Sequence, residues 1–87
     1  MEERRMTIPK ELLDKSNLKG ANKILFILEG KEILLSPYTE DWQGLKVLGS
    51  RALDEKGRFF FPTNLHVSPE ELMIYNCDGE IWITRHI

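Results

Sequence analysis

The sequence predicts a small, mainly β domain with one or two short helices. Three observations lead to this. Short apolar runs are separated by turns that contain glycine or proline, one segment has the composition of a helix, and the second half of the chain resembles the first. The 87 residues suffice for a single domain, 1–87, near the lower size limit for one core. With 41% hydrophobic and 30% charged residues, the composition is that of an ordinary globular protein.

The first half has the pattern of a strand, a helix and a hairpin. Pro9 suits the first position of a helix, where its missing N–H costs nothing, and good helix formers follow it. Gly30 separates two apolar runs and accepts the positive φ of a tight turn, which indicates a hairpin. The predicted elements are a strand, a helix and two hairpin strands at residues 5–8, 10–15, 23–28 and 32–36.

The second half contains strands and turns after a linker over residues 37–44. The turns are Asp54-Glu55-Lys56-Gly57 and Asp78-Gly79, because these residue types favour tight turns. Pro62 ends a strand, and the chain after it is shorter than the corresponding part of the first half, so we expect a vestigial helix there. The predicted strands lie at residues 45–53, 58–61, 72–75 and 81–84.

The two halves match as degenerate copies of one unit. Residues 5–12 match residues 58–65 in polarity and in the positions of Arg and Pro, and each half ends in a similar hairpin (EILL and EIWI as the last strands). We interpret residues 4–36 and 45–87 as two pseudo-repeats. Two such units predict a pseudo-two-fold barrel in which each unit buries the apolar face of the other.

Residues 53–62, LDEKGRFFFP, are similar to the signature of the AbrB/SpoVT/MazE superfamily, and residues 5–12 are similar to its second half. Two copies in one chain resemble the MraZ branch of that superfamily, and the resemblance covers residues 4–36 and 45–85. It implies a swapped-hairpin (cradle-loop) AbrB-like β-barrel formed from two tandem pseudo-repeats. It also implies a DNA-binding transcriptional regulator or an antitoxin, with duplex DNA as the partner.

The resemblance implies that arginines and lysines on the barrel face contact DNA. Arg58 matches the arginine after the turn glycine, and Arg5 is its counterpart in the first copy. Arginine can bind phosphate or guanine through two parallel hydrogen bonds. Asp54 and Gly57 match the turn residues and are expected to have a structural role. The candidate DNA-binding residues are Arg4, Arg5, Lys10, Arg51, Lys56 and Arg58.

Several of these residues also fit ordinary structural roles. Arg5 and Arg58 also fit ordinary surface residues, and Lys10 fits the solvated side of a helix. If residues 58–61 form a strand, Phe59, Phe60 and Phe61 cannot all face one side. Either both faces are covered or one ring is exposed at an interface, and base stacking is a third option.

An alternative function is an AbrB-like protein-interaction or antitoxin module that has lost or weakened DNA binding. The net charge of −2 favours it. So do Leu13-Asp14 and His66-Val67, which stand where AbrB-like proteins often carry arginine. An exposed strand edge would serve a protein partner or a second copy of the chain. The pattern fits an intrachain pseudo-dimer and a hairpin-exchanged homodimer equally well.

The residue pattern argues against an enzyme, a metal site and a cofactor. His66, His86 and Cys77 lack the spacing of metal ligands, the glycines are isolated, and no acid–base pair is evident. No apolar run approaches the ~20 residues of a membrane span. The charged start lacks a secretory signal and the lone cysteine predicts no disulfide, so we expect a cytoplasmic protein.

Overall fold

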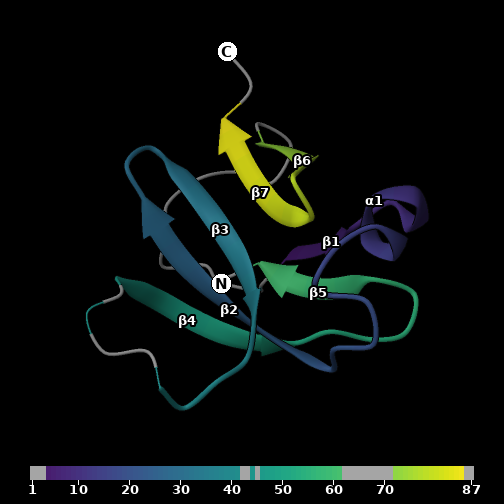
Figure 1. Cartoon of the computed structure of the whole chain (residues 1–87), viewed down its shortest axis with the longest axis horizontal. Coiled ribbons are helices and arrows are strands. Elements are labelled where there is room, and N and C mark those ends of the chain that lie inside the picture. Colours follow the sequence, from purple (N-terminus) through teal and green to yellow (C-terminus); the bar gives the residue numbers. More distant parts are fainter. Residues whose placement is uncertain (1–3, 42–43, 45, 62–71, 86–87) are drawn as a thin grey trace.

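The computed structural model describes residues 4–41, 44, 46–61 and 72–85, with only the backbone of Arg4 and Arg85. Within these residues the chain forms two antiparallel sheets and one short helix (Figure 1). The prediction of a mainly β chain with a helix after Pro9 is confirmed. The vestigial helix expected after Pro62 falls outside the described residues.

The strands are close to those predicted from the sequence. The element that differs most is the strand expected over residues 45–53, because the observed strand runs from Val47 to Ala52 and the described neighbours Lys46 and Leu53 lie outside it. In chain order the elements are β1 (Arg4–Thr7), α1 (Lys10–Asp14), β2 (Lys23–Glu29), β3 (Glu32–Pro37), β4 (Val47–Ala52), β5 (Arg58–Phe61), β6 (Leu72–Cys77) and β7 (Glu80–Arg85).

The smaller sheet is the pair β1–β5, and the larger sheet has the order β4-β2-β3-β7-β6. Both predicted hairpins are present, as β2–β3 and β6–β7. The second turns through Asp78 and Gly79, whose φ angles of 52° and 85° are those of a type I′ turn, the form that suits the twist of a hairpin. Pairing of β3 with β7 joins the two hairpins into one sheet.

Two of the strand pairings between the halves are centred on residues that the sequence comparison aligns. In β1–β5, Met6 lies opposite Phe59, and these residues hold the same position in the two copies. In β3–β7, Leu34 lies opposite Trp82, which are again counterparts. An antiparallel pairing centred on equivalent residues is the arrangement that a two-fold relation between the halves requires.

Helix α1 is a single turn held at both ends by hydrogen bonds. It starts after Pro9, whose carbonyl accepts the amides of Leu12 and Leu13 at 3.0 and 2.9 Å. At its end, the side-chain amide of Asn76 donates to the carbonyls of Leu12 (3.1 Å) and Lys15 (3.3 Å). The second hairpin therefore satisfies carbonyls that the end of a helix leaves without partners.

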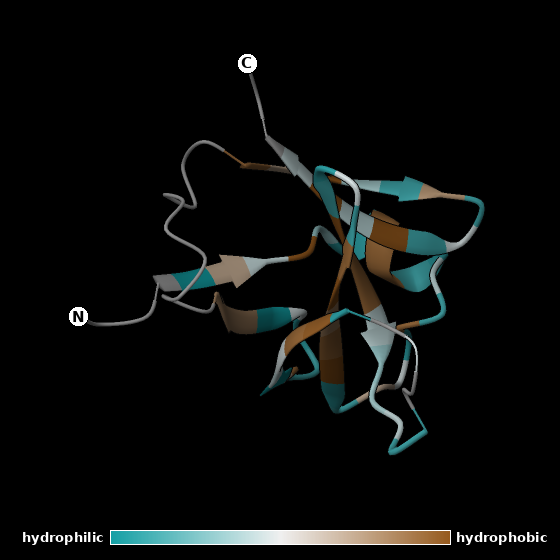
Figure 2. Cartoon of the chain, turned by 90° about the vertical axis from the view of Figure 1, so that its left-hand side faces the viewer, coloured by the Kyte–Doolittle hydropathy of each residue, from teal (hydrophilic) through white to brown (hydrophobic). Residues whose placement is uncertain are grey.

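The core lies between the two sheets and α1. Figure 2 shows the apolar stretches gathered towards the middle of the molecule and hydrophilic residues at the hairpin turns. Phe59 and Phe61 are buried and flank Phe26, with ring centroids 5.7 and 6.4 Å away, whereas Phe60 is 45% exposed. Of the arrangements expected for the three phenylalanines, the structure has the one with a single exposed ring.

Across the described ranges, no helix is both long and apolar enough to cross a bilayer. The described helix α1 has five residues, against about 20 for a transmembrane span.

Candidate nucleic-acid interface

The β1–β5 pair turns Met6, Phe59 and Phe61 to the core and its other side outward. Arg5 lies opposite Phe60, and Thr7 lies opposite Arg58. Directly opposed residues share a face of an antiparallel pair, and successive residues alternate between faces. The outer side, here called the ribbon face, therefore consists of Arg5, Thr7, Arg58 and Phe60. Arg58 is partly exposed and the other three are exposed.

Arg5 lies over the ring of Phe60. Its guanidinium carbon is 5.3 Å from the ring centroid, within the range of a cation–π contact. The contact follows from the register, because Arg5 and Phe60 are direct cross-strand neighbours. Among the described residues, Arg5 has no carboxylate partner.

Arg58 is tied to Asp54 through both its backbone and its side chain. One carboxylate oxygen of Asp54 accepts the amides of Lys56 (3.0 Å) and Arg58 (2.8 Å). The other accepts Nε of Arg58 at 2.6 Å. The Asp54 carboxylate thus accepts hydrogen bonds both from backbone amides at the turn before β5 and from the side chain of Arg58, the first residue of that strand.

These contacts hold the pKa of the Asp54 carboxyl below its ordinary value. The amide of Arg58 is the largest cause, and the Arg58 guanidinium and the Lys56 amide add to it, while partial desolvation opposes them. Asp54 is therefore ionised near neutral pH, and its charge offsets part of the charge of Arg58.

Gly57 lies where the turn crosses the end of β1. Its φ is +81°, and an added Cβ would lie 2.8 Å from the carbonyl oxygen of Ile8 and 3.3 Å from a methyl carbon of Leu13. The carbonyl of Gly57 accepts the amide of Ile8 at 2.8 Å, and its amide donates to the carbonyl of Asp54 at 3.0 Å. Glycine meets both requirements of this position, the positive φ and the close backbone approach.

Arg5 and Arg58 line the same open depression on the ribbon face, of about 170 Å³. Phe60 and Asp54 contribute to its wall, together with Phe59 and Ala52. Two arginines and an exposed phenylalanine thus line one small surface hollow. Such a hollow fits a phosphate or the edge of a base.

Of the other candidate cations, the three whose side chains are described do not line this depression. Lys10 is exposed at the start of α1, and Lys56 is exposed in the turn before β5. Arg51 lies in β4 opposite Ile24, and one of its terminal amino groups donates to the Ser50 carbonyl at 2.6 Å. Of Arg4, only the backbone is described, in β1.

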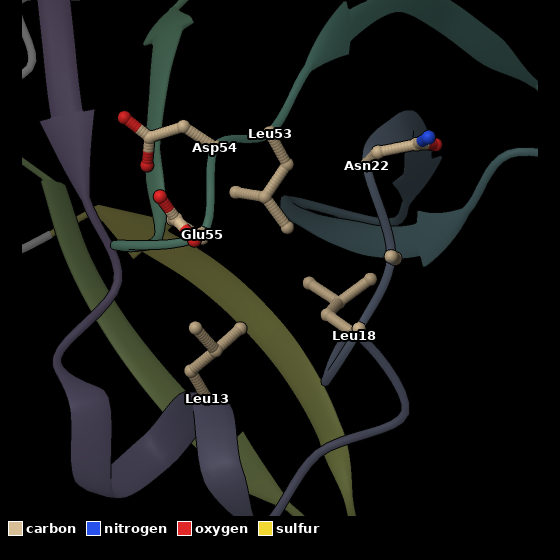
Figure 3. Close-up of a pocket in the computed structure, with 8 residues that line it drawn as sticks. Leu13, Leu18, Asn22, Leu53, Asp54 and Glu55 are labelled. Carbon is tan, nitrogen blue, oxygen red and sulfur yellow. The ribbon is translucent and has the colours of Figure 1, made fainter.

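A second pocket, of about 230 Å³, lies beside the same turn (Figure 3). Leu13, Leu18 and Leu53 point towards one another in it, and Asp54 and Glu55 belong to its lining. Leucines form the apolar part of this pocket, and its two described carboxylates, Asp54 and Glu55, belong to the turn before β5. Asp54 takes part in both pockets and so connects the apolar pocket to the ribbon face.

Sequence reasoning did not single out Asn76, Tyr75 or Thr7. Asn76 bonds α1 and also accepts the amide of Gly79 at 3.0 Å. The hydroxyl of Tyr75 donates to the carboxylate of Glu32, which is the main cause that raises the pKa of Tyr75 to about 12. Thr7 was detectable, because in a strand it alternates onto the same face as Arg5.

Among the described residues, no group of three or more His, Cys, Asp and Glu side chains is placed to hold a metal ion. Cys77 is an exposed free thiol. The two histidines considered as ligands from the sequence, His66 and His86, lie outside the described residues.

Comparison with family models, with curated proteins and with solved structures finds no match to this chain.

Proposed function

We propose that this chain is a DNA-binding transcriptional regulator that contacts duplex DNA through the ribbon face. The observation that carries the proposal is the convergence of Arg5 and Arg58 on one exposed hollow. Neither β1 nor β5 contains an acidic residue. Asp54, which is the one carboxylate among the described residues of the hollow, is bonded to Arg58. The ribbon face is thus locally basic although the whole chain has a charge of −2.

The shape of the β1–β5 pair supports the same proposal. The major groove of B-DNA admits a two-stranded β-ribbon. Arginine side chains that project from such a ribbon can donate to phosphate oxygens and to base edges. Thr7 adds an exposed hydroxyl that can hydrogen-bond to either.

For the fold, we propose the AbrB-like swapped-hairpin barrel, with residues 4–36 and 45–87 as its pseudo-repeats. The opposition of Met6 with Phe59 and of Leu34 with Trp82 supports it. A regulator of this class would act in the cytoplasm.

The alternative is an AbrB-like protein-interaction or antitoxin module. Strand β6 favours it, because among the described strands β6 ends the five-stranded sheet and carries Met73, which is 46% exposed. A strand added along β6 would satisfy its outer backbone groups and cover this side chain.

Binding of labelled duplex DNA over a salt series, with heparin as a competitor, tests the proposal. The test variant is Arg5→Ala/Arg58→Ala, and the matched control is Lys19→Ala/Lys31→Ala, which removes the same charge from two exposed residues outside the ribbon face. We expect wild-type affinity to fall steeply with salt. The slope should decrease by about 1 if one of the two arginines contacts a phosphate and by about 2 if both do, since each phosphate contact contributes about 0.9.

Equal weakening in the test and control variants would assign the binding to overall charge and refute the ribbon face. Absence of wild-type binding at low salt would refute DNA binding itself. Capture of a protein through β6 would then be the function to test.

A further inference from the structure

Arg5 and Arg58 hold equivalent positions in the two halves but have different local partners. Arg58 is bonded by a carboxylate, whereas Arg5 lies on an aromatic ring. Their registers are reciprocal, since Arg5 faces Phe60 and Arg58 faces Thr7, the counterpart of Phe60. The two arginines therefore differ in their contacts because the residues around them differ, although their positions in β1 and β5 are equivalent.

The partner of Arg58 restrains the side chain before any ligand binds. Nε is held at 2.6 Å by a carboxylate that two backbone amides fix in place. With Nε engaged, the N–H groups of the two terminal nitrogens are the remaining donors of the guanidinium. Restraint of this kind lowers the entropy lost on binding and favours ligands whose acceptors match one geometry.

The contact of Arg5 imposes less geometry. A cation–π contact, here 5.3 Å from the guanidinium carbon to the ring centroid, depends less on direction than a hydrogen bond does. Among the described residues no carboxylate forms an ion pair with Arg5. An exposed cation with this freedom suits phosphates. A phosphate can be approached from several directions, and its attraction to a cation depends more on charge than on one hydrogen-bond direction.

We propose that the two arginines divide the work of DNA recognition. Arg58, aimed by Asp54 as a positioning residue, distinguishes base sequence, whereas Arg5 supplies sequence-independent attraction to phosphates. The inference rests on the proposed DNA binding and assigns roles within that site. On this inference the Asp54 carboxylate contributes to sequence specificity although it lies on a DNA-binding face.

Asp54→Asn tests this inference, because a purely electrostatic role of Asp54 and an aiming role predict different effects on sequence discrimination. The substitution removes a negative charge but retains an oxygen that can accept the amides of Lys56 and Arg58. If Asp54 acted only through its charge, every duplex would bind more tightly and discrimination would stay the same. If Asp54 aims Arg58, discrimination falls while affinity for unrelated duplexes holds or rises.

The probes are a duplex selected by the wild-type chain from a random-sequence library and a scrambled duplex of the same composition. We expect Asp54→Asn and Arg58→Lys each to reduce the affinity ratio between them about tenfold, the loss of one bidentate base contact. Arg5→Ala should weaken both duplexes by a similar factor, reduce the salt slope by about 1 and leave the ratio unchanged. Arg58→Lys keeps the backbone bonds of the turn, so it serves if Asp54→Asn does not fold.

Unchanged discrimination in both Asp54→Asn and Arg58→Lys would overturn the division of roles, as would loss of discrimination in Arg5→Ala. A wild-type chain that binds all duplexes equally would also overturn it, while duplex binding itself would stand. Failure of the wild-type chain to bind any duplex at low salt would remove the proposed function and this inference together.

Discussion

Substituting Gly57 with alanine separates the two constraints that act on the turn before β5. The left-handed φ of +81° costs an L-residue about 1–2 kcal/mol. The new Cβ would also lie 2.8 Å from the backbone oxygen of Ile8, so the turn and the end of β1 must move apart. That movement weakens the 2.8 Å hydrogen bond from Ile8 to Gly57, a loss of about 0.5–1.5 kcal/mol.

The matched control is Gly20→Ala. Gly20 has nearly the same φ, +82°, but an added Cβ there would have nothing within 4 Å. It should therefore show the conformational cost alone, about 1–2 kcal/mol. Gly57→Ala should show in addition the cost of displacing the backbone and of crowding the Leu13 methyl group. The total loss in the free energy of unfolding should be about 2–4 kcal/mol.

Urea or thermal unfolding of the two variants, followed by circular dichroism, measures this difference. For a domain of this size, 1 kcal/mol corresponds to about 4–8 °C in Tm. Gly57→Ala should therefore unfold several degrees below Gly20→Ala. Equal stability of the two variants would refute the close approach of the turn to Ile8 and with it the packing of the turn against β1.

Three further predictions concern side-chain contacts. Asn76→Ala should destabilise the chain by about 1–2 kcal/mol, because two carbonyls at the end of α1 lose a donor. Asn22→Ala, at an exposed position, is its control in the same urea titration, and an equal effect would argue against the contact. Because the folded pKa of Asp54 is lowered, its contribution to stability is present above the ordinary carboxyl pKa of about 3.9 and is lost as pH falls through the folded value. The stability difference between wild type and Asp54→Asn should therefore shrink in acid, and a constant difference down to the acid transition would contradict the pairing. Because the folded pKa of Tyr75 is raised to about 12, its contribution is present below pH ~10 and is lost as pH rises towards 12. The ultraviolet absorbance of tyrosinate should show a late-titrating component that Tyr75→Phe removes, and its persistence in that variant would assign it elsewhere.

The local structure was largely predictable from the sequence because short-range rules decide it. Pro9 marks the start of α1 and Gly30 lies in the turn of the first hairpin. The exposed position of Phe60 follows from the alternation of a strand once its neighbours are buried. Such features depend on neighbours within a few residues along the chain.

The pairing of distant strands was harder to predict. β4 lies beside β2, from the other half of the chain, and β3 lies beside β7. Any apolar strand could pair with β2 or β3 through its backbone, so the burial pattern of the sequence does not select one partner. Asn76 shows the same limit, because its partner Leu12 lies 64 residues away and an asparagine near a glycine first suggests a local turn.

The candidate site was predictable in part. The motif identified Arg5 and Arg58, which the structure brings to one hollow together with Phe60. It also identified Asp54 as a turn residue, but not the bond from its second oxygen to Arg58, which depends on side-chain conformation. The remaining candidate cations are spread along the sequence, and sequence alone does not tell which of them share a face.

Titration of the isotopically labelled chain with duplex DNA at low salt, followed by amide chemical shifts, tests the ribbon face most directly. We expect the largest shifts in β1, in the turn 54–57 and in β5, and we expect them to reverse as salt is added. Shifts largest in β6 and β7, or no shifts at all, would contradict this expectation.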